Sequence, residues 1–393
     1  MELKNRAIFI ARRFSFISLT LCLSTNRAIW ATSAVSIPTP SGPYNVGFTR
    51  HTIQHYNNQD PLAPNNISTA FLATIFYPTK QVPQGMRKPY LNPETAAIYE
   101  QSYNYTPGVL ASLTSSLQED APFLSPYGSE TVTSFPTILF GPGGVGPPTE
   151  GSTILLSELA SYGYTVVGLD HPFEQPFLRF PNGTGVFGAD VDLSDIDLIK
   201  AIYHTRLVDN AVFLQYFPEL VQKLNAPFNV NLFGLLGYSL GGAAALGTML
   251  DEENEYHLAA GLNLDGTLWG RLTDNSSTID LHRNVLLLGE DQMNDPTWIS
   301  FSIQQTGFYF RKILIEGTRH HDFSDDTFWK TVEPGVDLSV GTINGLRQTD
   351  ITNTFVKAFF DHSLLGGDDK ILYRPSANWP ELTYFYRNGS MVS

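Results

Sequence analysis

The sequence predicts an α/β fold in which helices cover both faces of a mostly parallel central sheet. Short apolar runs rich in Val, Ile, Leu and Phe recur along the chain and are typical of buried strands. Helical segments separate these runs, as parallel strands require a crossover connection. A hydrophobic content of 42% over 393 residues is enough for a sizeable core.

The expected elements follow from these patterns in chain order. Expected strands lie at 46–53, 69–77, 135–140, 164–169, 232–236, 258–264, 284–289 and 308–316, and expected helices at 94–103, 152–162, 195–217 and from 242 onward. The first two strands are expected to be antiparallel, and the strand at 308–316 is expected to be the last. Residues 81–133 lack clear periodicity, so we expect them either to shape a substrate pocket or to form a surface excursion. The loop at 173–189 is expected to be exposed.

The first 33 residues differ from the rest and predict a signal peptide. Basic residues between positions 4 and 13 precede the apolar run 14–23, which is too short to span a bilayer, and small residues follow it. Cleavage would leave residues 34–393 as a single secreted, extracellular domain. The one cysteine, Cys22, lies in the predicted signal, so cysteine catalysis and thiolate metal sites are excluded for the mature chain.

The charge balance excludes some classes of partner. Charged residues make up 16% of the chain and the net charge is −14, so neither nucleic acid nor an anionic membrane surface is expected as the main partner. Glycosylation sequons begin at Asn66, Asn104, Asn182, Asn275 and Asn388, which fits export from a eukaryotic cell.

The segment 231–248 predicts a nucleophilic serine. An apolar run predicts a buried strand, Gly237-Tyr238-Ser239-Leu240-Gly241 forms a sharp turn, and an Ala-rich segment suits the start of a helix. With 32 glycines in the chain the five-residue pattern arises readily by chance, but the strand before it and the helix after it favour a functional turn. Glycines flank Ser239 because so tight a turn brings neighbouring backbones too close for side chains.

A glycine-rich loop is expected beside this serine. The strand at 135–140 runs into Gly141-Pro-Gly-Gly-Val-Gly-Pro147, and in hydrolases of this architecture that loop directs backbone N–H groups at a developing oxyanion. We assign one donor to Gly144 and the other to Leu240. A phosphate-binding loop is excluded, because neither a following Lys-Ser/Thr nor a dinucleotide-binding glycine pattern is present.

A serine hydroxyl needs a histidine to take its proton and a carboxylate to orient that histidine. In this architecture the histidine follows the nucleophile, where His320 and His321 are both available, whereas His171 precedes it and is disfavoured. Only one of two adjacent side chains is expected to reach the serine. Asp265 and Asp291 each end a strand after the nucleophile, and spacing alone leaves both open as the acid.

Family resemblance narrows these choices. The segments Leu159-Ala-Ser-Tyr-Gly-Tyr-Thr-Val-Val, Gly-Tyr-Ser-Leu-Gly-Gly-Ala, Leu264-Asp-Gly-Thr-Leu-Trp and His320-His-Asp-Phe-Ser-Asp325 together resemble the plasma-type platelet-activating factor acetylhydrolase family, over roughly residues 70–365. The resemblance implies an α/β-hydrolase fold with an inserted loop and helix region, and calcium-independent removal of short or oxidised acyl chains from phospholipids. It makes Ser239 the nucleophile, Asp265 the acid and His320 the base. The chain departs from the family at Pro142-Gly143, where His-Gly is usual, and at Tyr238, where His is common.

The sequence therefore predicts a secreted serine esterase for short acyl esters, similar to 1-alkyl-2-acetylglycerophosphocholine esterases. The alternatives are a general carboxylesterase, a cutinase-like polyester hydrolase, and a non-catalytic binding protein on a hydrolase scaffold. No cofactor or metal is expected, because consecutive histidines rarely converge on one ion and the His-Glu-x-x-His spacing is absent. The expected partner is a small-molecule or lipid ester, and transient contact with a lipid surface is left open.

Overall fold

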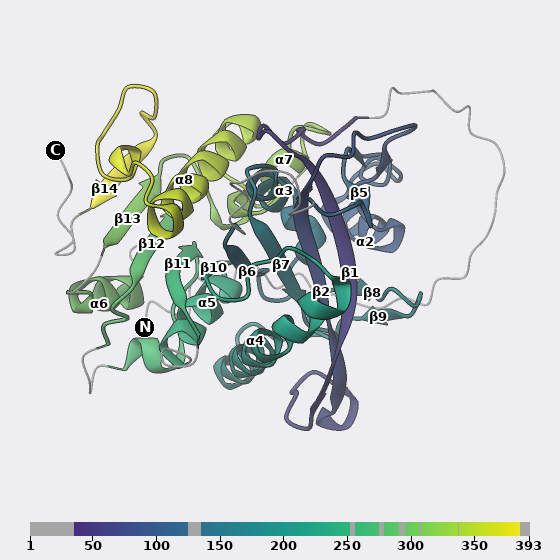
Figure 1. Cartoon of the computed structure of the whole chain (residues 1–393), viewed down its shortest axis with the longest axis horizontal. Coiled ribbons are helices and arrows are strands. Elements are labelled where there is room, and N and C mark those ends of the chain that lie inside the picture. Colours follow the sequence, from purple (N-terminus) through teal and green to yellow (C-terminus); the bar gives the residue numbers. More distant parts are fainter. Residues whose placement is uncertain are drawn as a thin grey trace.

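A ten-stranded sheet forms the centre of the molecule, in the order β14-β13-β12-β11-β10-β6-β7-β2-β1-β5. The computed structural model describes residues 35–124, 135–251, 256–274, 279–290, 295–306, 309–336 and 338–385. Figure 1 shows the sheet crossing the molecule with helices on both of its faces. The predicted α/β class is confirmed.

Most neighbouring strands of the sheet are parallel. Its strands are β1 Asn45–Asn57, β2 Ser68–Thr79, β5 Gln118–Glu119, β6 Thr137–Gly141, β7 Thr165–Asp170, β10 Phe233–Tyr238, β11 Leu258–Leu264, β12 Asn284–Glu290, β13 Phe310–Ile315 and β14 Leu382–Phe385. Strands β6, β7 and β10 to β13 pair in parallel, whereas β1 with β2, β2 with β7, and β13 with β14 are antiparallel. The carboxyl ends of the parallel strands therefore meet at one edge, where sites assemble in such sheets.

Helices pack on both faces of this sheet. They are α2 Pro93–Tyr103, α3 Thr153–Ser161, α4 Ile196–Leu224, α5 Leu240–Asp251, α6 Pro296–Gln304, α7 Asp326–Trp329 and α8 Gly345–Leu365. One face is covered by α4, α5 and α6, which contribute Phe213, Leu246 and Trp298 to its core. The other is covered by α3 and α8, which contribute Leu156 and Phe355. Burying each such side chain contributes roughly 1.5–3 kcal/mol, so the two apolar layers fix the sheet between the helices.

Helix α4 differs from its prediction in length and in what it buries. It continues through Pro218, past the predicted end at 217. Of the apolar residues whose spacing predicts the core face of this helix, Ile199, Ile202 and Leu214 are buried, whereas Leu207 and Val208 are half-buried. Its buried residues also include Arg206 and Asp209. Each of these two charged side chains has a partner from the loop after β7, which offsets the loss of hydration.

One further expectation about elements is confirmed only in part, and another is wrong. The segment 173–189, expected to be exposed, is exposed over most of residues 181–187 but largely buried up to Phe180, and it forms a hairpin between β8 Phe177–Arg179 and β9 Gly185–Phe187. The strand at 308–316 is not the last, because β14 adds antiparallel to it as the edge of the sheet. Both misses concern strands of only three or four residues, which are too short to show a periodicity.

Residues 81–124 pack against the segment that follows β13. This region contains β3 Lys88–Pro89, which pairs with β4 Thr114–Ser115, as well as α2. Tyr90 Oη donates to Asp325 Oδ2 at 2.6 Å, and Tyr105 Oη donates to Trp329 O at 2.9 Å. The region thus supports the chain just after His320, while its role in shaping a substrate pocket stays a prediction.

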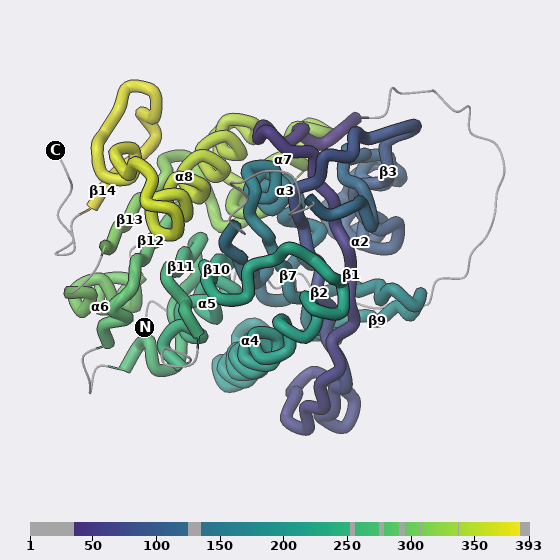
Figure 2. Tube along the Cα trace, in the orientation of Figure 1, coloured from purple at the N-terminus to yellow at the C-terminus, as the bar shows by residue number. Residues whose placement is uncertain are grey.

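The amino-terminal part of the described chain runs along α3. Tyr44 N–H donates to Ser161 O at 3.1 Å, and Figure 2 shows this segment passing over α3. The predicted signal peptide, residues 1–33, lies outside the described residues. Within the described ranges, no helix is both long enough and apolar enough to cross a membrane.

Candidate active site

Ser239 lies in the sharp turn between β10 and α5, as the sequence predicts. Its φ of 56° is in the left-handed region that residues other than glycine seldom adopt. A Cβ added at Gly237 would lie 2.1 Å from the carbonyl of Gly241, so the turn closes only without a side chain there. Ser239 N–H donates to Leu264 O at 2.8 Å, which ties the turn to β11. Strain at this serine is typical of a nucleophile elbow.

The side chains of Ser239, His320 and Asp265 form one hydrogen-bonded chain. His320 Nε2 lies 2.9 Å from Ser239 Oγ, and His320 Nδ1 lies 2.6 Å from Asp265 Oδ2. The tautomer with its hydrogen on Nδ1 donates to the carboxylate and leaves Nε2 free to accept the serine proton. The His320 side chain is 33% exposed and that of Asp265 only 3%, so the imidazole is open to reactants while the acid is shielded.

Backbone groups of β12 hold Asp265 in place. Asp265 Oδ1 accepts the Glu290 N–H at 2.8 Å, and Asp265 N–H donates to Leu288 O at 2.9 Å. The residue has a φ of 55°, in the left-handed region that aspartate adopts more readily than most residues other than glycine. Asp291, the alternative acid, lies outside the described residues. The described end of its strand supplies a hydrogen-bond donor to Asp265.

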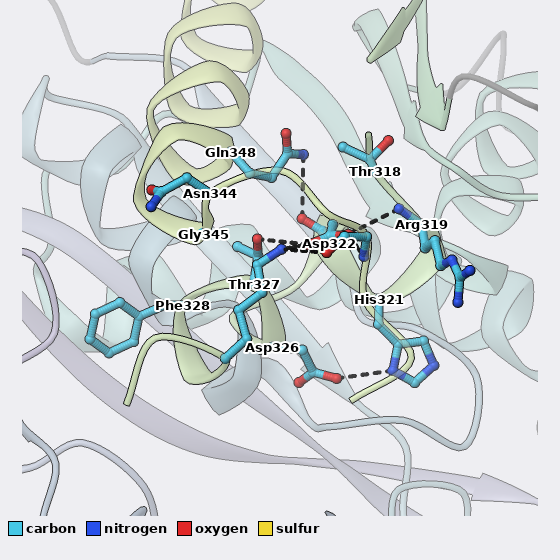
Figure 3. Close-up of polar contacts among 12 residues, drawn as sticks. Thr318, Arg319, His321, Asp322, Asp326, Thr327, Phe328, Asn344, Gly345 and Gln348 are labelled. Atoms are coloured by element: carbon cyan, nitrogen blue, oxygen red, sulfur yellow. Dashed lines mark hydrogen bonds and ion pairs between the residues drawn. The ribbon is translucent and has the colours of Figure 1, made fainter. Parts of the chain in front are cut away.

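His321 points to a different carboxylate from its neighbour. Its Nδ1 lies 3.1 Å from Asp326 Oδ2, as Figure 3 shows. Burial lowers the pKa of His321, but the hydrogen bond and the charge of Asp326 outweigh it and raise the pKa above 6.5. The ring centroids of His320 and His321 are 6.1 Å apart. The structure therefore brings His320, and not His321, to Ser239.

Asp322 fixes the turn that carries His320, a role that was not predicted from the sequence. Its carboxylate accepts hydrogen bonds from Arg319 N, Thr327 Oγ1, Lys330 Nζ and Gly341 N. Its backbone oxygen accepts from Gln348 Nε2 of α8 at 3.4 Å. Figure 3 shows the bonds from Arg319, Thr327 and Gln348 meeting at Asp322. The sequence offers one indication of this role: Asp322 is an acidic residue two positions after His320, within the segment 320–325 that also carries the family resemblance.

The ring of Tyr238 supports the imidazole of His320. Their ring centroids lie 5.0 Å apart with an interplanar angle of 38°. Burial raises the pKa of Tyr238, so its hydroxyl stays neutral. An aromatic ring thus stands beside the histidine at a position where the resembling family commonly has His.

The predicted oxyanion loop passes directly beside Ser239. A Cβ added at Gly143 would lie 2.7 Å from the Tyr238 ring and 3.6 Å from Ser239 Cβ. A Cβ added at Gly144 would lie 3.1 Å from Leu240 Cδ2, so the two predicted donors are neighbours. Leu240 begins α5, and the N–H groups of a first helical turn have no acceptor within the helix. The role of Gly144 and Leu240 as donors stays a prediction.

The loop after β7 carries two buried partners of α4. His171 Nδ1 lies 2.6 Å from Asp209 Oδ2, and Arg206 Nη2 lies 2.6 Å from Glu174 Oε1. His171 therefore pairs with a structural carboxylate, in agreement with its being disfavoured as the base. Neither pair was expected, because no sequence pattern signals which buried charges will meet. Among the described residues, no cluster of His, Cys, Asp or Glu is arranged to hold a metal ion.

Comparison with known proteins tests the fold and the resemblance. No protein-family model matches the chain. The chain is 28% identical over 267 residues to a "Probable 1-alkyl-2-acetylglycerophosphocholine esterase" of Arthroderma benhamiae. The aligned region covers 63% of this chain and 66% of that protein. A solved structure, a ferulic acid esterase from Streptomyces cinnamoneus, superposes with a TM-score of 0.73 at 24% identity, over 90% of this chain and 99% of that one. The chain has the α/β-hydrolase fold.

The fold class and the resemblance predicted from sequence are thus confirmed, and both of these proteins are named as esterases. In an α/β-hydrolase the nucleophile, acid and histidine follow one another along the chain at the carboxyl ends of strands. Here Ser239 follows β10, Asp265 follows β11 and His320 comes after β13. The arrangement of these three side chains on this fold can perform nucleophilic acyl transfer.

Proposed function

We propose that the protein is a secreted serine esterase that removes short acyl groups from esters, with an sn-2-acetyl phospholipid as its substrate class. The observation that carries the proposal is the hydrogen-bonded chain from Ser239 through His320 to Asp265. The name of the Arthroderma benhamiae relative, a probable 1-alkyl-2-acetylglycerophosphocholine esterase, supports the substrate class.

In the first step of the proposed reaction, Ser239 Oγ attacks the ester carbonyl carbon while its proton passes to His320 Nε2. Asp265 stabilises the imidazolium through the bond to Nδ1 and does not itself take the proton. The negative charge that develops on the carbonyl oxygen is stabilised by the N–H groups of Gly144 and Leu240. Each such donor contributes roughly 2.7–4 kcal/mol of transition-state stabilisation in comparable enzymes.

The second half of the reaction regenerates the serine. His320 gives its proton to the departing alcohol, here the lysophospholipid, and an acyl-enzyme remains on Ser239. Water then attacks the acyl carbon while His320 takes one of its protons. The bond between the acyl carbon and Ser239 Oγ breaks as His320 returns that proton to Oγ, and acetic acid leaves and ionises to acetate. The 33% exposure of the His320 side chain allows water to approach the same face of the imidazole.

The proposal includes export and glycosylation. Residues 1–33 carry the features of a signal peptide. Asn66, Asn104 and Asn182 are exposed and begin sequons, while the sequons at Asn275 and Asn388 begin outside the described residues. Expression in a eukaryotic cell should deliver a product to the medium that lacks the first 33 residues and loses mass on treatment with a glycosidase. Retention of those residues in the exported protein would contradict the proposed cleavage.

The decisive test measures hydrolysis of an sn-2-acetyl phospholipid and of p-nitrophenyl acetate by the secreted protein and by Ser239→Ala. Activity on both substrates, lost in Ser239→Ala, is the expected result. Activity on p-nitrophenyl acetate alone would contradict the phospholipid substrate and would favour a general carboxylesterase or a polyester hydrolase. A folded wild-type protein inactive on short esters of either kind would favour a binding protein on a hydrolase scaffold.

A further inference from the structure

A buried ion pair stands behind the predicted oxyanion loop. Arg206, on α4, and Glu174, in the loop after β7, have side chains that are 1% and 3% exposed. Arg206 Nε lies 3.0 Å from Glu174 Oε2, and Arg206 Nη2 lies 2.6 Å from Glu174 Oε1. A buried pair of this kind is weak evidence for stability, because desolvation of both charges opposes their attraction. The contacts that the pair makes therefore point to a role other than stability.

The same two side chains hold the backbone of the loop. Arg206 Nη1 donates to Pro142 O at 2.6 Å, and Arg206 Nη2 donates to Gly143 O at 3.2 Å. On the other side of the pair, Glu174 Oε1 accepts the Val145 N–H at 3.4 Å. The ion pair thus contacts successive peptide groups of the loop, from the carbonyl of Pro142 to the N–H of Val145. Only a planar guanidinium offers enough donors in one fork to bind a carboxylate and two carbonyls together.

These contacts decide where the loop's remaining N–H groups point. In a trans peptide the carbonyl oxygen and the following N–H lie on opposite sides of the chain. With Gly143 O bound to Arg206, the N–H of Gly144 must point away from Arg206. The other side of the loop faces Tyr238 and Ser239, as the 3.6 Å between an added Gly143 Cβ and Ser239 Cβ indicates.

The loop needs such a restraint. Val145 has a φ of 56°, which is strongly disfavoured for a β-branched residue. The glycines at 143 and 144 have no side chains that could resist rotation of the peptide between them. Rotation of that peptide would exchange the carbonyl and the N–H, and would present an oxygen to the developing oxyanion. A fixed donor is valuable in catalysis because it needs no reorganisation when charge appears.

We propose that Arg206, with its partner Glu174, is a positioning residue that orients the Gly144 N–H in the oxyanion hole; this inference rests on the proposed esterase function. Arg206 touches no reacting atom. It acts through the carbonyls of Pro142 and Gly143, so its loss should weaken stabilisation of the tetrahedral intermediate and leave substrate binding largely intact. A merely structural Arg206 would change the unfolding temperature without changing the chemistry of the site.

The test compares Arg206→Lys and Arg206→Gln with the wild type and with a matched control, Arg271→Gln. Arg271 is 64% exposed and pairs with Asp251 on the surface, away from the loop. We expect kcat on p-nitrophenyl acetate to fall by about 100-fold in Arg206→Gln, with KM changed by no more than about twofold. Arg206→Lys keeps the charge beside Glu174 but cannot bind both carbonyls, so kcat should fall there as well.

A second measurement reports on the oxyanion hole directly. The ratio of kcat/KM for an oxygen ester to that for the matching thionoester is large when N–H donors bind the oxyanion, because sulfur accepts hydrogen bonds poorly. We expect this ratio to fall in both Arg206 variants and to stay at the wild-type value in Arg271→Gln. If Arg206→Gln does not fold, by circular dichroism and thermal unfolding, Arg206→Lys carries the same two measurements.

The outcomes separate this inference from the function on which it rests. Wild-type kcat and an unchanged oxygen-to-sulfur ratio in a folded Arg206 variant would overturn the positioning role and leave the esterase intact. Recovery of kcat in Arg206→Ala on addition of guanidinium, without recovery in Ser239→Ala, would support it. A wild-type protein with no activity on either ester would overturn the proposed function, and the positioning role with it.

Discussion

Two histidine–aspartate pairs in this molecule share the same bond and differ in their surroundings. In both His320–Asp265 and His171–Asp209 the Nδ1 atom lies 2.6 Å from a carboxylate oxygen. The His171 side chain is 5% exposed and the His320 side chain is 33% exposed. His320 also reaches Ser239 Oγ with its other nitrogen. The bond to an acid is therefore common to both pairs, and exposure together with the serine sets His320 apart.

A hydrogen bond to a carboxylate does not by itself mark a histidine as a proton-transfer group. A carboxylate that orients an imidazole serves equally to satisfy a buried polar group in a core. Function requires in addition a second ring nitrogen that is aimed at a reacting atom and open to substrate. His320 meets that condition because Asp322 holds its turn at the edge of the sheet. His171 instead closes the space between the loop after β7 and α4.

The largest effect should come from breaking the pair that contacts the serine. In His320→Ala we expect kcat/KM on p-nitrophenyl acetate to fall by about 10⁴- to 10⁶-fold, because Ser239 loses its base. The unfolding temperature should change little, since the ring is partly exposed. Residual activity within about tenfold of the wild type would mean that another group takes the serine proton.

The acid of that pair is tested by Asp265→Asn beside Asp291→Asn. The amide cannot hold the imidazole in the required tautomer, so we expect kcat to fall by about 10³- to 10⁴-fold in Asp265→Asn. Asp291→Asn should leave kcat within about threefold of the wild type, because Asp265 already forms the hydrogen bond to His320 Nδ1. A large fall in kcat in Asp291→Asn, with little change in Asp265→Asn, would identify Asp291 as the acid and would remove Asp265 from the proposed triad.

Mutation of the buried pair His171–Asp209 should lower stability and leave catalysis largely unchanged. His171→Ala leaves Asp209 without its partner in a dry site, so we expect a loss of about 3 kcal/mol in the free energy of unfolding. Its kcat should stay within about threefold of the wild type. The matched control is His257→Ala, an exposed histidine whose loss should change stability by less than about 0.5 kcal/mol. A large fall in kcat with unchanged stability would erase the distinction between the two pairs.

Much of the fold could be predicted because long elements repeat their pattern. The run 258–264 coincides with β11, and the antiparallel opening pair is β1 with β2. Helix α4 was placed correctly and Ile199, Ile202 and Leu214 are buried as predicted, but the burial of Arg206 and Asp209 was not predicted because both are charged. Their burial depends on partners from a different loop, which no periodicity reports. The short strands β8, β9 and β14 were not predicted for a related reason. Each has only three or four residues, and each is defined by its pairing with another strand rather than by a pattern in the sequence.

Prediction of the site shows the same division. Ser239 could be found because its local turn carries its own signal, a strand, two glycines and a helix. Asp265 and His320 were separable from Asp291 and His321 only through family resemblance, since spacing along the chain does not say which side chain faces the serine. Asp322 and the Arg206–Glu174 pair were missed. Their contacts join segments far apart in sequence, so only the fold reveals them.

A buried carboxylate without a histidine extends the comparison to pH. Burial raises the pKa of Asp325 from 3.8 to about 7. Because the folded-state pKa lies above the unfolded value, the folded form binds the proton more tightly, and stability falls as pH rises through about 7. This group alone should reduce stability by about 2 kcal/mol between about pH 5.5 and pH 8.5. Asp325→Asn cannot ionise and should lose that part of the pH dependence, measured by denaturant unfolding at both pH values. An undiminished slope would show that Asp325 is already ionised at pH 5.5.

The third pair, His321–Asp326, lies between the other two in exposure, at 21% for the histidine, and should give the smallest effect. The pKa of His321 is raised above 6.5, so its contribution to stability is complete below about pH 6.5 and is lost as pH rises through the folded-state pKa. His321→Gln should therefore destabilise the protein by less than about 1 kcal/mol at pH 5.5 and by almost nothing at pH 9. This is the opposite end of the pH range from Asp325→Asn, because one variant removes a favourable charge at low pH and the other removes an unfavourable charge at high pH. Thermal unfolding at the two pH values, with kcat measured on the same samples, separates stability from catalysis. A fall in kcat as large as that of His320→Ala would mean that both adjacent histidines serve Ser239, and that exposure alone does not mark the active one.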